Sequence, residues 1–227
     1  FQLPVDGNTN NNLWVLSDSS SGYQLGQFDG AVFTPSTSKL PGNNGAGFYA
    51  AQTFTSMAPG DRRVVRMGWA QISTPGMPFN QLMYFPTELT LATTGNGPRL
   101  CSVPIAEITN NALTVYSWTN LAVSPGFNPL SGIRGTLFDV KAQFTTNTAQ
   151  AINFTFQGVA VTYDASTQQI SCNGVTSALP PLNGSVQLEI VVDRDSIEIF
   201  GNGGLLYMPL PVSNPAGNSL ISLTCTG

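Results

Sequence analysis

The residues from Gly135 to Gly227 alternate between short apolar runs and tight-turn signals, and this pattern restricts the fold more than any other feature. The runs recur about every ten residues, and dipeptides such as Asn173-Gly174 and Asn183-Gly184 separate them. Asn and Gly adopt the positive φ angles of hairpin turns readily, so the pattern predicts an antiparallel β-sandwich. The expected strands span 137–144, 152–156, 159–163, 170–172, 186–192, 197–200, 205–209 and 220–225.

Residues 23–91 carry a second set of short strand signals. Phe48–Phe54 has an aromatic residue at each end and Arg66–Trp69 ends on one, and Gly, Pro and Asn separate the runs. We expect consecutive strands of a β-propeller here, so the whole chain is predicted to be all-β. Within residues 1–36 the expected strands are 13–16, 23–28 and 31–33, and a short helical turn is expected after the segment 104–108.

Asp29-Gly30 lies between two of these runs and is typical of a tight two-residue hairpin turn. Asp29 therefore has two interpretations, a turn residue or a pocket carboxylate. We favour the turn.

The composition indicates a neutral, polar surface. Charged residues make up only 9% of the chain, the net charge is -4, and Lys39 and Lys141 are its two lysines. Nucleic acid is not an expected partner, because phosphate binding needs clustered Lys and Arg. The one such cluster, around Arg62 and Arg63, is interpreted as the flank of a strand. A neutral carbohydrate suits this composition better.

Other classes of protein and site find no support in the sequence. No run approaches the length of a transmembrane helix, so no membrane partner is expected. Metal-ligand spacing and a Gly-rich phosphate loop are also missing, so neither a metal nor a cofactor is expected. The three cysteines fit one disulfide plus a thiol, or three reduced thiols. Of the possible disulfides, Cys172 with Cys225 is favoured.

The order of the segments resembles glycoside hydrolase family 32, the invertases, inulinases and levanases. Similar enzymes carry Tyr-x-x-Gly-x-Phe-Asp-Gly, Phe-Tyr-Ala, Gly-Trp and Pro-x-Glu-Leu in this order, and these motifs begin here at Tyr23, Phe48, Gly68 and Pro86. The stretch 192–200 resembles the strand signature of the family's C-terminal sandwich. The resemblance implies the last blades of a five-bladed β-propeller over 1–111, followed by a β-sandwich over 112–227.

The resemblance also implies a function, the retaining hydrolysis of β-fructofuranosidic bonds in levan, inulin or sucrose. Family members use an Asp in an Asn-Asp-Pro-Asn-like stretch, an Asp in Arg-Asp-Pro and a Glu in Glu-Cys-Pro, and none of these motifs occurs here. We name no catalytic residue in this chain. The chain aligns from just after the acid/base residue, so the acids are expected on a missing N-terminal half.

That missing half, or a second copy of the chain, is then the expected protein partner. Secretion is expected, to an extracellular or periplasmic location. The alternative is a non-catalytic carbohydrate-binding or truncated module without hydrolase activity of its own. Catalysis by residual acids is disfavoured, because the chain has no His and no nucleophile-elbow pattern.

Four substrate-binding residues are predicted from the resemblance: Trp69, Tyr49, Gln52 and Asn43. Tyr49, Gln52 and Trp69 are placed near the sugar, with core packing as the alternative for each. Asn43 or Asn44 stands where relatives often have an Asp. Glu88 is expected to be structural, paired with an arginine such as Arg99.

Overall fold

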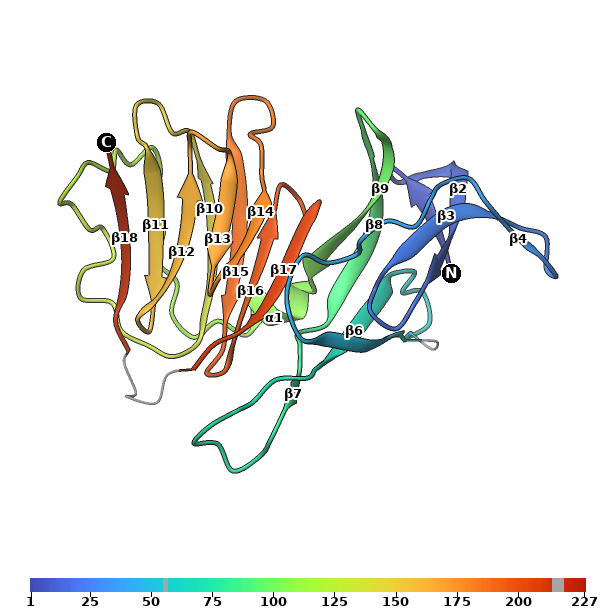
Figure 1. The fold of residues 1–227 in the computed structure, drawn as a ribbon, viewed down its shortest axis with the longest axis horizontal. Helices are drawn as coiled ribbons and strands as arrows, with labels where there is room; N and C mark the ends of the chain where they lie inside the picture. Colours follow the sequence, from blue (N-terminus) through green and yellow to red (C-terminus); the bar gives the residue numbers. More distant parts are fainter. Residues whose placement is uncertain (55–56, 214–218) are drawn as a thin grey trace.

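The computed structural model describes residues 1–54, 57–213 and 219–227, and the fold over these residues is almost entirely β. Figure 1 shows two parts, with β1–β9 on the right and β10–β18 on the left. The prediction of an all-β chain is confirmed.

The first part is a nine-stranded sheet made of two antiparallel groups. We call β1–β4 the first blade and β5–β9 the second blade. One parallel bridge joins β1 to β8, between Val5 and Leu91. Within the described residues none of the sheets closes on itself. The strands are β1 (Gln2–Val5), β2 (Asn8–Ser17), β3 (Tyr23–Phe28), β4 (Phe33–Pro35), β5 (Phe48–Thr53), β6 (Val64–Ala70), β7 (Leu82–Met83), β8 (Thr87–Thr94) and β9 (Gly97–Pro104).

The second part follows the short helix α1 (Ala106–Asn110) and consists of two antiparallel sheets. One has the order β10-β15-β16-β17, and the other has the order β14-β13-β12-β11-β18. The strands are β10 (Phe138–Phe144), β11 (Ala151–Phe156), β12 (Val159–Asp164), β13 (Gln169–Cys172), β14 (Val175–Ala178), β15 (Val186–Val192), β16 (Ser196–Gly201), β17 (Leu206–Pro211) and β18 (Ile221–Thr226).

The predicted sandwich is confirmed, together with its turn chemistry. Asn173 and Gly174 have φ angles of 47° and 79°, and Cys172 pairs with Val175 across them. This is the two-residue hairpin that the dipeptide predicts. The sequence does not predict the strand after it, β14, because Val-Thr-Ser-Ala is short and half polar and lies at the edge of its sheet.

The sheet that contains β16 is buried on both of its faces. Ile197 and Ile199 point into the sandwich core, whereas Glu198 and Phe200 point toward the second blade. Phe200 and Tyr207 share a buried cluster with Phe48 of β5. A strand alternates its side chains between faces, so this single strand serves two cores. The sandwich thereby supports the second blade.

The structure corrects the prediction for the turn at Asp29. The Asp29 carboxylate accepts hydrogen bonds from the backbone N–H groups of Ala31 and Val32, both at 2.8 Å, so the turn role is confirmed. The turn is not a two-residue one, however, because Phe28 pairs with Phe33 and residues 29–32 connect them. The side chain stabilises a wider loop.

Two further corrections concern the first blade. Strand β1 was not predicted, and β2 extends well beyond the expected 13–16. The extension runs through the exposed polar residues Asn8–Asn11 and the half-buried Asn12, which show no apolar alternation. Backbone hydrogen bonds to β1 hold this part of β2. Such pairing leaves no hydrophobic pattern in the sequence, so the pattern does not predict it.

The favoured disulfide is wrong, because Cys101, Cys172 and Cys225 are all free and buried. Cys172 lies on β13 and Cys225 on β18, with β12 and β11 between them. Neighbouring strands are about 4.8 Å apart, so three spacings place the two residues roughly 14 Å from each other. A disulfide requires Cα atoms within about 7 Å.

None of the helical structure in the described ranges is long and apolar enough to cross a membrane.

Candidate functional site

The second blade presents three of the four predicted substrate-binding residues on one face. Tyr49 of β5 pairs directly with Trp69 of β6, and Gln52 pairs with Met67. Trp69 also pairs with Met83 of β7. Residues directly opposite each other in a sheet, and residues two apart on one strand, point to the same side. We call these five residues the open face.

A β-bulge brings Tyr49 and Gln52 to the same side. The two residues are three positions apart, so on a regular strand they would point to opposite faces. The register shifts between them, and Ala50 has a φ of 47°. The N–H of Ala51 donates to the carbonyl of Ser19 at 2.9 Å, which fixes the bulged segment against the first blade. The extra residue in β5 turns the side chain of Gln52 to the same face of the sheet as that of Tyr49.

The open face is accessible on one side and firmly supported on the other. Tyr49 is 41% exposed and Met83 is 51% exposed, while Trp69 is half-buried. On the opposite side Phe48 stacks on Tyr84 with ring centroids 5.8 Å apart, and its edge meets Tyr207 at 5.7 Å. The aromatic cluster fixes the strands that display the accessible side chains.

The side-chain amide of the fourth predicted residue, Asn43, bonds the loop between β2 and β3 as well as its own loop. Its Nδ2 donates to the Ser21 hydroxyl at 2.7 Å and to the Ser20 carbonyl at 3.1 Å, and its Oδ1 accepts from the N–H of Gly45 at 3.0 Å. These contacts hold the loop that leads into β5. Binding of a sugar by Asn43, as by the other three residues, stays a prediction.

The expected ion pair between Glu88 and Arg99 is wrong. Arg99 pairs with Ala92 along β8, four residues from Glu88 and so roughly 13 Å away. Its guanidinium donates to the carbonyl of Pro98 at 2.9 Å. Across the residues that the structure describes, Glu88 forms no ion pair.

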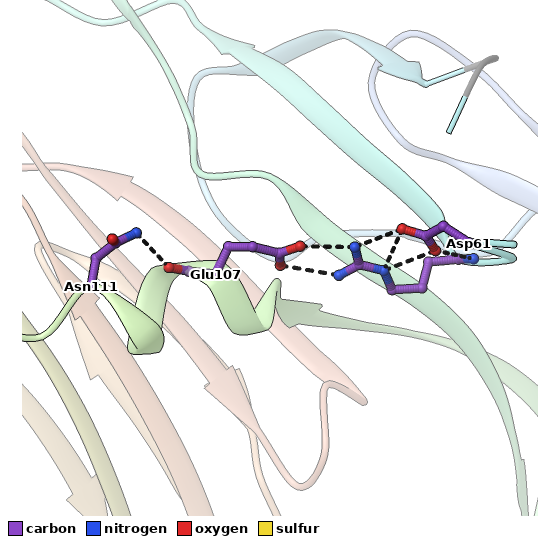
Figure 2. Close-up of polar contacts among 4 residues, drawn as sticks. Asp61, Glu107 and Asn111 are labelled. Atoms are coloured by element: carbon purple, nitrogen blue, oxygen red, sulfur yellow. Dashed lines mark hydrogen bonds and ion pairs between the residues drawn. The ribbon is translucent and has the colours of Figure 1, made fainter. Parts of the chain in front are cut away.

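Arg63 joins the second blade to α1, a role that the sequence interpretation as a strand flank does not include. Arg63 contacts the carboxylates of both Asp61 (2.7 Å) and Glu107 (2.8 Å), as Figure 2 shows for the two acids on either side of the guanidinium. Hydrogen bonds from Arg63 hold the pKa values of both acids below their ordinary range. These contacts are structural, and a sequence pattern does not report pairs 44 residues apart.

Behind the open face, Arg66 is buried and has no carboxylate partner in the part of the chain that the structure describes. It is 2% exposed, and its guanidinium carbon lies 5.3 Å from the Phe48 ring centroid and 5.9 Å from that of Tyr207. Nη2 donates to the Ser102 hydroxyl at 3.0 Å, whereas Nε and Nη1 have no partner among the described residues. Aromatic faces stabilise the cation, while burial lowers its pKa.

Glu198 is a second buried ionisable group, and the sequence alone does not reveal it. Its carboxyl oxygens accept hydrogen bonds from the N–H of Phe85 and from the hydroxyl of Tyr207, both at 2.7 Å. Burial raises the pKa of Glu198 to about 8. The residue spans the contact between β16 and the second blade. The alternation of residues 196–200 predicts that Glu198 points away from the sandwich core. The sequence does not show that the second blade lies on that side.

This arrangement can bind a neutral ligand, because the open face offers two aromatic rings, an amide and two thioethers. It contains no carboxylate pair. Across the described residues no group of three or more His, Cys, Asp or Glu side chains is placed to hold a metal ion.

Comparison with known proteins identifies the family. A model of the Glycosyl hydrolases family 32 N-terminal domain matches residues 7–104, and a model of the Glycosyl hydrolases family 32 C terminal matches residues 107–208. The chain belongs to glycoside hydrolase family 32. The predicted family resemblance is confirmed.

Relatives with assigned activities are similar over most of this chain. A levanase of Bacillus subtilis is 31% identical across 90% of the chain, which corresponds to 36% of the levanase. An extracellular exo-inulinase of Aspergillus ficuum is 28% identical across 90% of the chain, which corresponds to 47% of that enzyme. The chain thus spans between about a third and a half of the length of these family 32 relatives.

A solved family structure has the same fold. The exo-inulinase of Aspergillus awamori matches 100% of this chain and 53% of its own, with a TM-score of 0.83 at 24% identity. The predicted combination of propeller blades and a β-sandwich is confirmed, with the sheets here left open.

Proposed function

We propose that this chain is part of a fructan-degrading hydrolase of family 32, which cleaves β-fructofuranosidic bonds in levan, inulin or sucrose with retention of configuration. The observation that carries the proposal is the match of both family models, in order, to the two parts of the chain. The relatives named as a levanase and an exo-inulinase favour a fructan as the substrate.

The open face is the part of this chain that we assign to substrate binding. Trp69 and Tyr49 offer ring surfaces to the C–H groups of a fructosyl unit, and the amide of Gln52 can donate to or accept from its hydroxyls. The bulge at Ala50 and Ala51 places these groups side by side. Neutral groups of this kind bind and orient a sugar without supplying the chemistry.

Two carboxyl groups must supply the chemistry, and we assign them to polypeptide outside this chain. In a retaining reaction a carboxylate attacks the anomeric carbon while a carboxylic acid gives its proton to the departing oxygen. Water then attacks the same carbon, loses a proton to the second group and releases the sugar and the carboxylate. The three acidic motifs of the family are not found in this sequence.

The same proposal sets the domain boundary and the location. We place the propeller part at 1–111 and the sandwich at 112–227, with the boundary just after α1. We also propose an extracellular or periplasmic site of action, in line with the exo-inulinases that are named extracellular.

The open sheet of the two blades favours a protein partner. Unpaired strand edges attract further strands, and two blades expose inner faces that a closed propeller would cover. We propose that the remaining propeller half, or else a second copy of this chain, covers them. The same openness supports a second candidate, a carbohydrate-binding or truncated module with no hydrolase activity of its own.

The test combines two measurements on one native sample: its intact mass under denaturing conditions, and its release of fructose from levan, inulin and sucrose. We expect a larger polypeptide, or a second chain with the missing acids, together with fructose release. A mass near 24.0 kDa with no second chain and no fructose released would overturn the hydrolase proposal in favour of the module.

A further inference from the structure

The connector of residues 111–128, between α1 and the sandwich, exposes two aromatic rings in the same orientation. Tyr116 and Trp118 have ring centroids 6.1 Å apart and an interplanar angle of 17°. They are 57% and 46% exposed. The two rings stack on each other and both side chains are exposed, so a ligand can reach the outer side of the stacked pair.

Both ends of the connector are fixed to the fold. At the start, the N–H of Ala112 donates to the carbonyl of Thr109 at 3.1 Å. At the end, Asn128 accepts from the N–H of Leu223 at 3.0 Å, and the Cys225 thiol lies 3.4 Å from the carbonyl of Val123. The connector therefore runs between α1 and β18, which lie at opposite ends of the sandwich in Figure 1. The aromatic pair lies between the two fixed points.

The chemistry of the connector selects the kind of ligand. The sequence has no charged residue from Ile108 to Ile133, and Thr114, Ser117, Thr119 and Asn120 surround the two aromatic residues. Phosphate or carboxylate ligands need cations, which this stretch lacks. Exposed rings set among hydroxyl and amide groups suit a neutral, hydroxyl-rich ligand with apolar C–H faces.

We propose that Tyr116 and Trp118 form a second carbohydrate-binding surface, which holds a neutral polysaccharide apart from the open face of the second blade. The ring faces stack on sugar rings, while the Tyr116 hydroxyl and the Trp118 indole N–H remain able to hydrogen-bond. The choice of fructan as the polysaccharide rests on the proposed function. The surface itself follows from the exposed rings and the uncharged connector.

The experiment is affinity electrophoresis of the 227-residue chain in gels that contain levan, inulin, polygalacturonate or no polysaccharide. We expect levan and inulin to retard the chain and polygalacturonate to leave its mobility unchanged. Trp118→Ala and Tyr116→Ala should each weaken binding roughly three- to tenfold, which corresponds to the loss of one stacked aromatic contact. Trp118→Phe should retain most of the binding.

Leu113→Ala is the matched control, because Leu113 is 101% exposed on the same connector and has no ring. It should bind levan and inulin like the unmodified chain. Equal retardation by polygalacturonate, or unchanged binding in Trp118→Ala, would overturn the proposal. So would a Trp118→Ala chain that binds both fructans normally but no longer associates with the polypeptide that carries the acids.

The readout separates this proposal from the proposed function. If retardation depends on Trp118 but the sample releases no fructose, the second carbohydrate-binding surface is supported and the hydrolase proposal is overturned. If the sample releases fructose but retardation does not depend on Trp118, the hydrolase proposal is supported and the second surface is overturned.

Discussion

Trp69 and Gln52 lie on the same face but differ in how much of each side chain is exposed. The side chain of Trp69 is half-buried and stands opposite Tyr49 and Met83 of the neighbouring strands, whereas Gln52 is exposed. A half-buried ring loses less conformational freedom than an exposed side chain when a ligand stacks on it. An exposed amide must be ordered first, which reduces the net gain from its hydrogen bonds.

Replacing these two side chains should therefore weaken catalysis to different extents. In the proposed hydrolase we expect Gln52→Ala to lower kcat/KM for inulin or levan roughly three- to tenfold, as for one neutral hydrogen bond. Trp69→Ala should lower it more. Leu16→Ala, at an exposed position on β2 of the other blade, is the control and should leave kcat/KM unchanged. Wild-type kinetics in both site variants would exclude the open face from substrate binding.

Asn43 should behave differently, because its amide already has three partners, Ser20 and Ser21 in the loop between β2 and β3 and Gly45 in its own loop. Asn43→Ala should destabilise the fold by roughly 1–3 kcal/mol, measured by denaturant unfolding, since a neutral hydrogen bond contributes about 1 kcal/mol. Unchanged stability together with an increased KM would contradict this structural role and favour a direct contact with the sugar.

At the scale of elements, the hairpin of β5 and β6 shows why Gly precedes Trp in the Gly68-Trp69 pair. Gly68 lies opposite the bulge, and a side chain at this position would point to the buried side of the sheet. A Cβ atom built there would lie 2.3 Å from the ring of Phe48. The Phe48 ring is itself held between Tyr84 and Tyr207. The glycine thus provides the space that the aromatic support of the open face occupies.

Gly68→Ala should destabilise the fold by about 1–3 kcal/mol, the usual effect of overpacking a core. The loss should be smaller in a Phe48→Leu background, and a double-mutant cycle measures that coupling. Gly95→Ala is the control, because nothing lies within 4 Å of a Cβ built at Gly95. Identical losses in both backgrounds would show that the ring does not limit the space at Gly68.

The same hairpin shows how far the sequence alone can predict this fold. The strands at 48–53 and 64–70 follow from their apolar runs, and the hairpin at Asn173 follows from one dipeptide, because both signals are local. The bulge depends on a contact between Ala51 and Ser19 of the other blade, which no local pattern contains. Sequence reasoning therefore placed Tyr49, Gln52 and Trp69 on the right strands without showing why they share a face.

At the scale of the whole molecule, backbone and side-chain contacts join the two parts through the sheet that contains β16 and β17. The N–H of Asn44 donates to the carbonyl of Tyr207 at 2.8 Å, and the N–H of Ser102 donates to the carbonyl of Gly204 at 3.0 Å. The carboxyl of Glu198 lies among these contacts, fully buried, and bonds the second blade at Phe85. Its protonation state should therefore affect the stability of the whole chain.

We expect Glu198 to make the free energy of unfolding fall as the pH rises from about 4.5 to about 8. Its pKa is about 8 in the folded chain, against an ordinary value of 4.5, mainly because burial disfavours the charged form. The folded state therefore holds a proton that the unfolded state has already lost. The stabilisation is complete below the unfolded pKa and disappears as the pH passes the folded one, a change on the order of a few kcal/mol.

Glu198→Gln should remove this pH dependence. The glutamine is neutral at every pH, can accept from the N–H of Phe85 and can donate to the oxygen of Tyr207. The free energies of unfolding of the two proteins should be close near pH 5, and the variant should be the more stable near pH 8. Burial also raises the pKa values of Glu189 and Asp195, so the difference between variant and wild type, measured at each pH, isolates Glu198. If the two stability curves run parallel from pH 5 to pH 8, the carboxyl at Glu198 is charged throughout, and the contact between blade and sandwich is an ionised one.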